Sequence, residues 1–514
     1  MADLTPGPRR PRPPEIPFLP GVRTMFVGAI LLIALAPSVQ AITDPDFFWH
    51  LKVGQWIIDH GAIPHSDLFT FTVADHAFVA HEWLSEVIMA ALTGAFGLTG
   101  PSLFFGVVTW LGFLALVRTP RASFLMAGLA LALGMAAGMP IWGPRTQMIT
   151  FALVAGLLLV LRRYRETGDV RWLYPLPPVF VIWVNLHAGF TVGLLFLFTY
   201  LLGELLYARF AADDAFRPRL RPLALVAVLC TAAVAINPNF VGIYAYAVQT
   251  QFSSEQQKLI IEWFSPNFHD NNVRPFELML LLTVVVLIVT PRRPRVTDLL
   301  LVLGVIVLSL QSVRHIALFV AVVTPVLAEQ VQAIVDGHRQ RLPPFRLPRT
   351  TLAIGLLNLA VLLLVGTVIS ARFAIPGATA GFRNEMVTKG APVAALDFVE
   401  ADPPPGHVFN QYGWGGYFVY RLWPRVQPFV YGDAAVMGDP FLHEYDDVRS
   451  IRTNYRAVLD KYGVTWILYP TDDPLLLVME QSPDWTVVHR DDVATILVRR
   501  TPETRDYLAR HGQP

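Results

Sequence analysis

Cysteine is almost absent from this sequence of 514 residues, and charged residues are scarce. The single cysteine, Cys230, lies in an apolar run, so the chain has neither an intramolecular disulfide nor a zinc site built on thiolates. Charged residues make up 15% of the chain, against about 25% in an average soluble domain. The hydrophobic fraction is 54% and the mean hydropathy is +0.47. This composition predicts a polytopic integral membrane protein, because so little charge cannot cover a water-exposed surface.

The apolar residues gather in eleven nearly uncharged segments. Crossing about 30 Å of hydrocarbon takes roughly 17–25 helical residues, so several segments need a few flanking residues. The segments lie at 25–42, 103–117, 123–139, 147–161, 172–184, 189–206, 222–236, 276–290, 298–311, 315–332 and 350–371. We therefore expect a mainly α-helical membrane domain with about 11 transmembrane helices. Val39-Gln40-Ala41 also resembles a signal-peptide cleavage site, but the run before it is long enough to span.

Positive charge alternates between the loops in a way that orients the chain. With the N-terminus inside, the inside segments carry 21 arginines before residue 372, whereas the outside loops carry only 5 positive charges. Those five are Lys52, Arg145, Lys258, Arg274 and Arg314. Membrane proteins concentrate Lys and Arg in their cytoplasmic loops. The pattern predicts a cytoplasmic N-terminus and an external C-terminus, and it explains the arginine-rich loops without nucleic acid as a partner.

This topology divides the chain into three regions: a basic, proline-rich cytoplasmic tail (1–24), a membrane domain (25–372) and an extracytoplasmic α/β domain (373–514). In the last region, periodicity predicts helices at 392–400 and 451–462, and strands at 407–412, 428–433, 465–470, 485–489 and 494–499. About 140 residues can build one hydrophobic core, so we expect this domain to fold by itself. A long external loop, 237–275, contains Glu262–Pro266, either a lid over a groove or a packing loop.

The first external loop, 43–102, begins with Asp44-Pro45-Asp46, followed by aromatic residues and His50. Pro45 suits the first position of a helix with Asp44 as its N-cap, and Gly61 suits its C-terminal end. We expect this helix to be amphipathic and to lie at the outer leaflet.

A second amphipathic helix is expected to start near His81, Glu82 and Trp83, also at the outer leaflet. Its Glu82 and Glu86 are four residues apart, which places both on one polar side.

A first span that ends in an acidic motif, then an amphipathic helix, a proline-containing turn and another amphipathic helix, resembles the GT-C superfamily of polyprenyl-phosphate-sugar-dependent glycosyltransferases. The plan is also similar to the oligosaccharyltransferase catalytic subunit, which has many spans and then a soluble C-terminal domain. Segment 410–417 (NQYGWGGY) resembles the acceptor motif of that subunit, but no tryptophan pair and no aspartate precede Tyr412. The resemblance implies that an aspartate near the start of the first external helix, Asp44 or Asp46, is the catalytic carboxylate.

Sugar transfer from a lipid-linked donor needs a carboxylate that orients or deprotonates the acceptor hydroxyl, cations that hold the departing phosphate, and a groove for the polyprenyl chain. Asp46 and Asp44 are the candidates for the carboxylate, with Glu82 as a third. Helix capping is the alternative role for Asp44. The pair Asp44 and Asp46 would also suit Mg²⁺ or Mn²⁺ with water ligands, although the sequence does not demand a metal.

Two arginines stand at the outside ends of predicted spans, where arginine is otherwise scarce: Arg145 and Arg314, the latter followed by His315. Ionisable residues at such positions are candidates for function, here phosphate binding, and the alternative is snorkelling to lipid headgroups. His50, His81 and His187 are expected on the same outer face, each as either a structural or a donor-binding residue.

The sequence thus predicts an inner (plasma) membrane glycosyltransferase that moves a sugar from a polyprenyl phosphate or diphosphate to a glycan, lipid or protein acceptor outside the cytoplasm. The inside loops have no glycine-rich phosphate loop, so we expect no cytoplasmic nucleotide-sugar site. The alternatives are an oligosaccharide transferase acting on protein, and a non-catalytic transporter or scaffold with an envelope-binding domain. A transporter usually has an inverted repeat with broken helices near the midplane, and we find no such repeat in the sequence.

Overall fold

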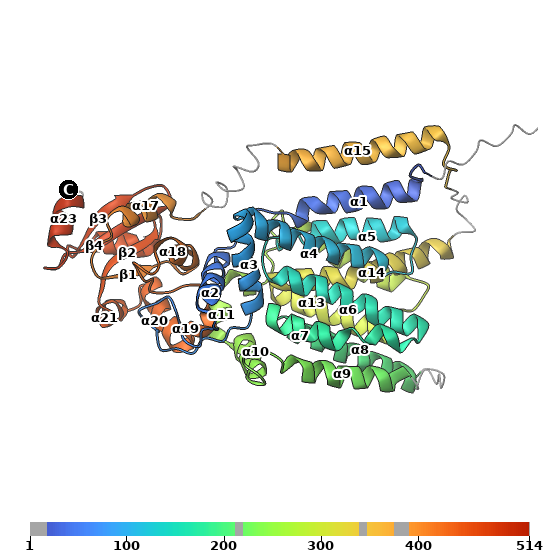
Figure 1. Cartoon of the computed structure of the whole chain (residues 1–514), viewed down its shortest axis with the longest axis horizontal. Helices are drawn as coiled ribbons and strands as arrows, with labels where there is room; N and C mark the ends of the chain where they lie inside the picture. The colour runs from blue at the N-terminus through green and yellow to red at the C-terminus, as the bar shows by residue number, and fades with distance from the viewer. Residues whose placement is uncertain (1–17, 211–218, 339–346, 375–389, 513–514) are drawn as a thin grey trace, which may run out of the picture.

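The computed structural model describes residues 18–210, 219–338, 347–374 and 390–512. Most of the predicted tail 1–24 and the loop arginines 217, 339, 341 and 346 therefore lie outside the described residues. Figure 1 shows two parts, a bundle of long helices and a smaller C-terminal part that contains the sheet. The external loop between the first two bundle helices lies at their junction.

Each of the eleven predicted segments coincides with a helix of the bundle. These helices are α1 (Val22–Ser38), α4 (Thr99–Arg118), α5 (Phe124–Ala137), α6 (Gln147–Thr167), α7 (Leu176–Leu186), α8 (Phe190–Phe210), α9 (Leu220–Val234), α12 (Arg274–Val289), α13 (Val296–Gln311), α14 (Ile316–Gly337) and α15 (Leu352–Ala374). Within the described residues, five helices are long and apolar enough by themselves to cross a membrane: α4, α6, α8, α15, and α14 with its preceding turn. The mainly helical architecture is confirmed, whereas the count of eleven spans stays a prediction.

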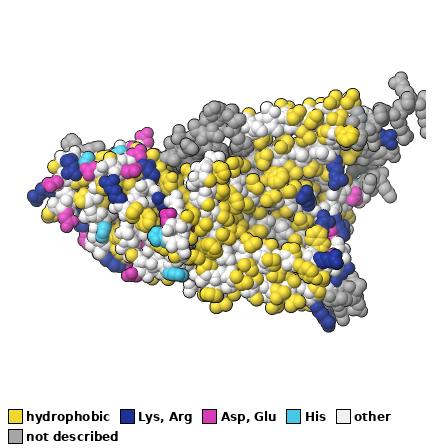
Figure 2. Space-filling model, in the orientation of Figure 1, with side chains coloured by type: hydrophobic (Ala, Val, Ile, Leu, Met, Phe, Trp, Pro, Cys, Tyr) yellow, Lys and Arg dark blue, Asp and Glu magenta, His cyan; other side chains and the backbone are white. Residues whose placement is uncertain are grey.

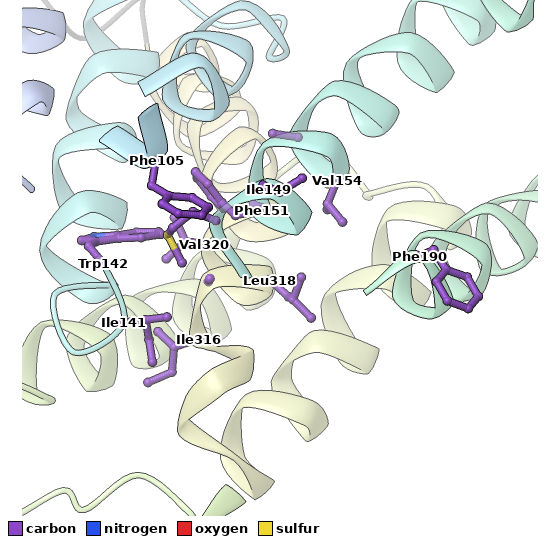
Figure 3. Packing of buried hydrophobic residues seen from close by; sticks show 14 of the residues in the cluster. Phe105, Ile141, Trp142, Ile149, Phe151, Val154, Phe190, Ile316, Leu318 and Val320 are labelled. Atoms are coloured by element: carbon purple, nitrogen blue, oxygen red, sulfur yellow. The ribbon is translucent and has the colours of Figure 1, made fainter. Parts of the chain in front are cut away.

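Aromatic side chains of the bundle core pack against the loop that precedes α6. Trp142 lies in that loop, with its ring centroid 4.9 Å from Phe151 of α6 (Figure 3). Its ring centroid is also 5.1 Å from that of Phe113 of α4. The indole N–H of Trp142 donates to the carbonyl of Met135 at 2.8 Å. The loop is thereby fixed to three helices, three residues before Arg145.

The C-terminal part is an α/β domain with a four-stranded sheet in the order β1-β2-β4-β3. Strand β1 (His407–Asn410) is parallel to β2 (Val464–Pro470), while β4 (Ala494–Arg499) runs antiparallel to β2 and to β3 (Trp485–Arg490). The short helices of this domain are α17 (Val393–Ala401), α18 (Gly415–Leu422), α19 (Ala434–Met437), α20 (Asp439–Arg449), α21 (Tyr455–Lys461), α22 (Pro474–Glu480) and α23 (Arg505–His511). Four of the five predicted strands are therefore confirmed.

The predicted strand 428–433 is wrong. This segment is mostly buried, but the side chain of Asn410 pairs with its backbone in place of a neighbouring strand. Asn410 Oδ1 accepts the N–H of Phe429 at 2.8 Å, and Nδ2 donates to the carbonyl of Val430 at 2.9 Å. The apolar pattern correctly predicted that this segment is buried. It wrongly predicted that the backbone of the segment would bond to a neighbouring strand.

The first external helices are not surface elements. Helix α2 (Asp46–His60) packs between α3 (Trp83–Phe96) and α18 of the C-terminal domain. Two glycines permit this close approach, because a Cβ at Gly54 would overlap the Glu86 carbonyl and a Cβ at Gly416 would overlap the Pro45 carbonyl. The two helices thus join the bundle to the C-terminal domain, where we had expected them to lie on a leaflet.

The external loop after α2 also completes the core of the C-terminal domain. Phe69 is fully buried, with ring centroids 5.3 Å from Tyr431 and 5.5 Å from Trp423. Thr72 Oγ1 donates to the Phe429 carbonyl at 2.7 Å, and the Trp423 indole donates to the Leu68 carbonyl at 3.1 Å. One hydrophobic core therefore extends across the predicted boundary at residue 373.

Charge is sorted along the long axis of the molecule. Figure 2 shows a largely apolar surface over the bundle, Lys and Arg at the bundle end farthest from the C-terminal domain, and mixed charge over that domain. The arginine-rich loops and the C-terminal domain thus lie at opposite ends of the bundle.

Candidate active site

A cavity of about 860 Å³ lies where the bundle meets the C-terminal domain. It is lined by α2, the start of α3, the loop before α6, the turn before α14 and residues 432–435. Helices α10 (Gly242–Phe252) and α11 (Ser254–Leu259) supply the remaining wall. Of the predicted site residues, the cavity brings together Asp44, Asp46, His50, His81, Glu82, Arg145, His187 and Arg314. His315 lines a second, adjoining cavity.

The acidic motif forms the N-terminus of α2. Pro45 has helical dihedrals, and Asp44 Oδ1 accepts the N–H of Asp46 at 3.0 Å. Asp44 therefore caps the helix as predicted, although the regular helix begins at Asp46. Gly61, with φ of 60°, ends the helix in the left-handed conformation that glycine adopts without strain.

The Asp46 carboxyl is directed into the cavity and lies against the backbone of Gly432 from the C-terminal domain. Burial, together with the adjacent charge of Asp44, raises the pKa of Asp46 to about 7, in spite of the opposing charge of His50. A carboxyl with a pKa near neutrality is suited to accept a proton in catalysis, because enough of it is ionised and the ionised form is basic.

Arg145 is held between two carboxylates. Its Nε lies 3.4 Å from Asp44 Oδ2, and its Nη1 forms an ion pair with Glu262. Gln147 Nε2 donates to the other oxygen of Glu262 at 3.2 Å. Burial disfavours the charge of Arg145, but Asp44 and Glu262 outweigh this effect and raise its pKa. Arg145 is therefore a permanent cation whose orientation is set from both sides.

Arg314 has a different environment. Its guanidinium lies 4.6 Å from the ring centroid of Trp263, a cation–π contact. Within the described residues, no carboxylate lies within ion-pair distance of Arg314. The backbone supports this placement, because Val313 N–H donates to the Phe264 carbonyl and Ser312 Oγ donates to the Glu262 carbonyl. Arg314 is thus a cavity-lining cation without a neutralising partner there.

Glu82 and Glu86 lie on one side of α3, as predicted, and this side is buried because it faces α2. His50 Nδ1 bonds to Glu86 Oε1 at 2.8 Å, and its Nε2 lies 3.9 Å from Glu82 Oε2. Burial opposes protonation of His50, but these two glutamates raise its pKa to about 9. An imidazolium between two carboxylates therefore fastens α2 to α3 directly behind Asp46.

Two further histidines contact Glu82. His81 Nε2 and His187 Nε2 each lie 3.4 Å from Glu82 Oε1. Gly189 N–H donates to His187 Nδ1 at 2.8 Å, so the neutral ring carries its hydrogen on Nε2 and directs it toward Glu82. Burial and the charge of Arg314 lower the pKa of His187 to about 4. The pKa of Glu82 is held well below its usual range because the neighbouring imidazoles outweigh its burial.

An adjoining cavity of about 870 Å³ continues from the polar cavity toward the bundle. The two share His81, Glu82, His187, Tyr246 and Arg314 among their lining residues. Beyond this shared rim the walls are mainly apolar, formed by Phe151, Val192, Ala247, Ala317 and Leu318. A polar head and an apolar chain of one ligand would therefore fit end to end.

The donor set does not fit a divalent ion at Asp44 and Asp46. Asp44 Oδ2 already faces a cation, because Arg145 Nε lies 3.4 Å away. Among residues 18–210, 219–338, 347–374 and 390–512, no group of three or more His, Cys, Asp or Glu residues could hold a metal ion. We derive no catalytic step through Mg²⁺ or Mn²⁺.

Three residues that were not among the predicted site residues also shape this site. Glu262, expected in a lid or packing loop, binds Arg145 across 117 positions of sequence. Asp433 lines the cavity and caps α19 through the N–H groups of Ala435 and Val436. The Tyr246 ring contacts His81 in a tilted arrangement, with centroids 4.8 Å apart. The contacts of Glu262 and Tyr246 are long-range and no local pattern marks them, whereas the cap that Asp433 forms is local.

No protein-family model matches the sequence, and no curated protein matches it. The apo crystal structure of ArnT from Cupriavidus metallidurans is similar to the chain at a TM-score of 0.52 and 14% identity, covering 95% of this chain and 98% of ArnT. The chain has the GT-C fold. Two other neighbours are the oligosaccharyltransferase AglB from Archaeoglobus fulgidus, solved with an inhibitory peptide and a dolichol-phosphate, and the mycobacterial arabinofuranosyltransferase AftD.

AglB has a TM-score of 0.49 and 11% identity, covering 91% of this chain and 74% of AglB. AftD has a TM-score of 0.48 and 13% identity, covering 96% of this chain but only 41% of AftD. All three neighbours are membrane glycosyltransferases of the GT-C superfamily. The predicted resemblance is confirmed for the fold by the similarity to ArnT, and the chemistry of this chain depends on its own residues.

Proposed function

We propose that the protein is a glycosyltransferase that moves a sugar from a polyprenyl phosphate or diphosphate to an acceptor hydroxyl at the outer membrane face. One observation carries the proposal: a buried carboxyl of raised pKa, Asp46, and an unpaired cation, Arg314, line one cavity that continues into an apolar groove. A lipid-linked sugar has the matching parts in the same order, namely sugar, phosphate and hydrocarbon chain.

In this mechanism the acceptor oxygen attacks the anomeric carbon of the sugar. The new C–O bond forms while the bond from the anomeric carbon to the phosphate oxygen breaks, and the lipid phosphate leaves with the electron pair. Asp46 accepts the acceptor proton as general base. Arg314 stabilises the charge that develops on the phosphate, assisted by the N–H groups of Arg145 that face away from Asp44 and Glu262.

Asp44 and Asp46 have different contacts, and we infer different roles for them. Asp44 is engaged with Arg145 and with the N–H of Asp46, which are structural roles. Asp46 has no ion pair within the described residues and is the carboxyl that burial keeps near neutral pKa. We therefore assign the base to Asp46, and to Asp44 the placement of Arg145.

Asp46→Asn in the full-length protein tests the proposal, with Asp59→Asn at the exposed end of the same helix as the matched control. Purified variants would be assayed for release of polyprenyl phosphate and for sugar transfer from a panel of polyprenyl-linked sugars. We expect Asp46→Asn to fold, to bind the donor and to lose roughly 10²–10⁴-fold in rate. Full activity in Asp46→Asn would refute the assignment of the base.

Donor binding without turnover in the unmodified protein, across all donors and acceptors, would favour a non-catalytic transporter or scaffold.

The class of acceptor depends on a different part of the chain. Segment 410–417, which resembles a peptide-acceptor motif, is engaged in packing: Trp414 and Tyr417 are buried, and Gly416 contacts Pro45. A glycan or lipid acceptor is therefore our preferred proposal, and transfer to a peptide in the same assay would overturn it.

We also propose the orientation in which the cavity and the C-terminal domain face away from the cytoplasm of an inner-membrane protein. The separation of the arginine-rich loops from that domain supports it. Reporter fusions after Gly168 and after residue 514 should report opposite compartments. The same compartment for both would refute the topology, including the proposed extracytoplasmic domain 373–514.

A further inference from the structure

Another cavity, of about 1290 Å³, lies at the arginine-rich end of the bundle, opposite the candidate active site. It is formed by the first turns of α1, the end of α4, the turn that leads to α5, the start of α5 and Arg163 of α6. It shares no lining residue with the active-site cavity.

The walls of this groove are apolar and firmly held together. Val27, Leu31, Leu114, Val117 and Phe124 line it. The indole of Trp110 on α4 donates to the Leu31 carbonyl of α1 at 2.9 Å. On the other side, Gly128 of α5 allows α1 to approach, because a Cβ there would touch the side chains of Phe26 and Ile30. The groove is therefore a feature of the packed bundle and does not depend on a loose helix.

The mouth of the groove is cationic. Its lining includes Arg23, Arg118 and Arg163, but no aspartate or glutamate among the described residues. Arg23 also lies in the first turn of α1, a helix of 17 residues, where free backbone N–H groups and the helix dipole favour an anion.

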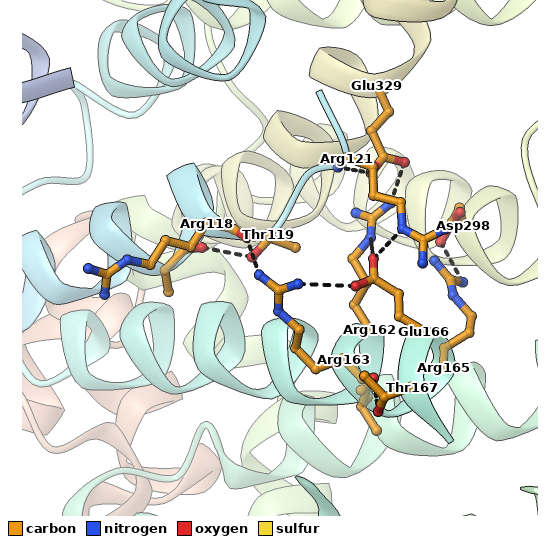
Figure 4. Close-up of polar contacts among 12 residues, drawn as sticks. Arg118, Thr119, Arg121, Arg162, Arg163, Arg165, Glu166, Thr167, Asp298 and Glu329 are labelled. Carbon is orange, nitrogen blue, oxygen red and sulfur yellow. Dashed lines mark hydrogen bonds and ion pairs between the residues drawn. The ribbon is translucent and has the colours of Figure 1, made fainter. Parts of the chain in front are cut away.

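The neighbouring arginines Arg121, Arg162 and Arg163 differ from Arg23 and Arg118 because they form ion pairs with glutamates (Figure 4). Arg121 pairs with Glu166 at 2.7 Å and Arg162 pairs with Glu329. Arg163 pairs with Glu166 at 3.2 Å, so it is partly neutralised. The guanidinium of Arg118 points away from this network, and no ion pair to Arg118 or Arg23 occurs within the described residues. Within the part of the chain that the structure describes, the network uses its acids internally and leaves Arg23 and Arg118 without an ion pair.

We propose that this groove binds an anionic diacyl phospholipid, with its phosphate between Arg23 and Arg118 and one acyl chain between α1 and α4. Surplus positive charge selects against a zwitterionic headgroup, which brings its own cation. An inorganic anion would leave the apolar walls exposed, whereas an acyl chain covers them. Basic pockets between spans are a recurring form of lipid-headgroup site. The bound lipid would brace α1, the helix that leads into Asp44 and Asp46.

The test uses the delipidated full-length protein in a neutral detergent, with binding measured by native mass spectrometry and melting temperature. The probes are dioleoylphosphatidylglycerol, dioleoylphosphatidylcholine and inorganic phosphate. We expect one tightly bound phosphatidylglycerol, at least tenfold weaker binding of phosphatidylcholine and no stabilisation by phosphate. Equal affinity for the two lipids, or equal stabilisation by phosphate, would overturn the proposal. Stronger displacement by polyprenyl phosphate than by phosphatidylglycerol would also overturn it.

Variants locate the site. The double variant Arg23→Gln/Arg118→Gln should lose at least tenfold in affinity for phosphatidylglycerol. Arg171→Gln removes one charge from an exposed arginine outside the groove and should bind normally. Leu114→Trp fills the groove while it keeps both arginines, and should also lose the lipid. If Leu114→Trp and the double variant bind as the unmodified protein does, the groove is not the site. Arg118→Lys, which keeps the charge, should retain binding and guards against a double variant that fails to fold.

Discussion

Gly432 of the C-terminal domain lies directly against the carboxylate of Asp46, so that a Cβ atom there would overlap Asp46 Oδ1 and come within 2.9 Å of Trp49 Nε1. The C-terminal domain therefore supplies one wall of the candidate active site. It also explains why Asp46 is buried although it lies at the first turn of a helix that joins two parts of the molecule.

Gly432→Ala should displace Asp46 and leave most of the fold intact. Displacements near 1 Å can cost about 10²-fold in rate, while an extra methyl group in a packed site costs about 1–3 kcal/mol in stability. Transfer assays and melting temperatures measured together separate the two effects. Gly94→Ala is the control, because a Cβ at that position in α3 meets nothing within 4 Å. Unchanged transfer in Gly432→Ala would show that Asp46 tolerates displacement and is not the base.

The pH profile of transfer should report Asp46. A base must be deprotonated, so kcat/KM should rise with pH through about 7, the raised pKa of this carboxyl. The charge of Asp44 raises that pKa, so Asp44→Asn should move the rise to lower pH. The imidazolium of His50 lowers it, so His50→Gln should move the rise to higher pH.

The opposite signs make this pair of variants informative, because general damage to the site cannot produce shifts in both directions. Asp59→Asn on the same helix should leave the profile unchanged. A rise that stays at the same pH in Asp44→Asn and His50→Gln would assign it to another group.

The fold was predictable where the signal is local. Apolar runs located the bundle helices, and Gly61 located the end of α2, because hydropathy and glycine dihedrals act within one element. Segment 428–433 was wrongly predicted as a strand because its backbone bonds to the side chain of Asn410. The periodicity of apolar residues cannot indicate such a contact. Glu82 and Glu86 were given the correct spacing and the wrong environment, since the imidazole that neutralises them comes from α2.

The packing of the external loop into the C-terminal domain is another long-range contact that no local pattern indicates, and it yields a prediction on Phe69. Phe69→Ala in the external loop should destabilise the C-terminal domain by about 3–5 kcal/mol, the usual cost of deleting a buried phenylalanine side chain. Limited proteolysis of the full-length protein at increasing temperatures would measure this destabilisation, as the temperature at which cleavage within residues 390–512 begins. Phe96→Ala, at a side chain that is 68% exposed, is the control. For the same reason we now expect the isolated segment 373–514 to lack a cooperative melt. If Phe69→Ala leaves the protease resistance unchanged, the domain folds by itself as the sequence first indicated.

The two arginines of the cavity should separate binding from structure. Arg314 has no carboxylate partner within the described residues, so Arg314→Gln should preserve melting temperature and raise the KM for the lipid donor roughly 10–150-fold, the value of one charged hydrogen bond. Arg145→Gln should instead lower the melting temperature, because it leaves Asp44 and Glu262 close together without their shared cation. Adding Glu262→Gln to Arg145→Gln removes one of these carboxylates and should recover part of the lost stability without restoring transfer. Equal losses of stability in the two single variants, with KM unchanged in Arg314→Gln, would make Arg314 a structural residue and leave the donor phosphate without its assigned partner.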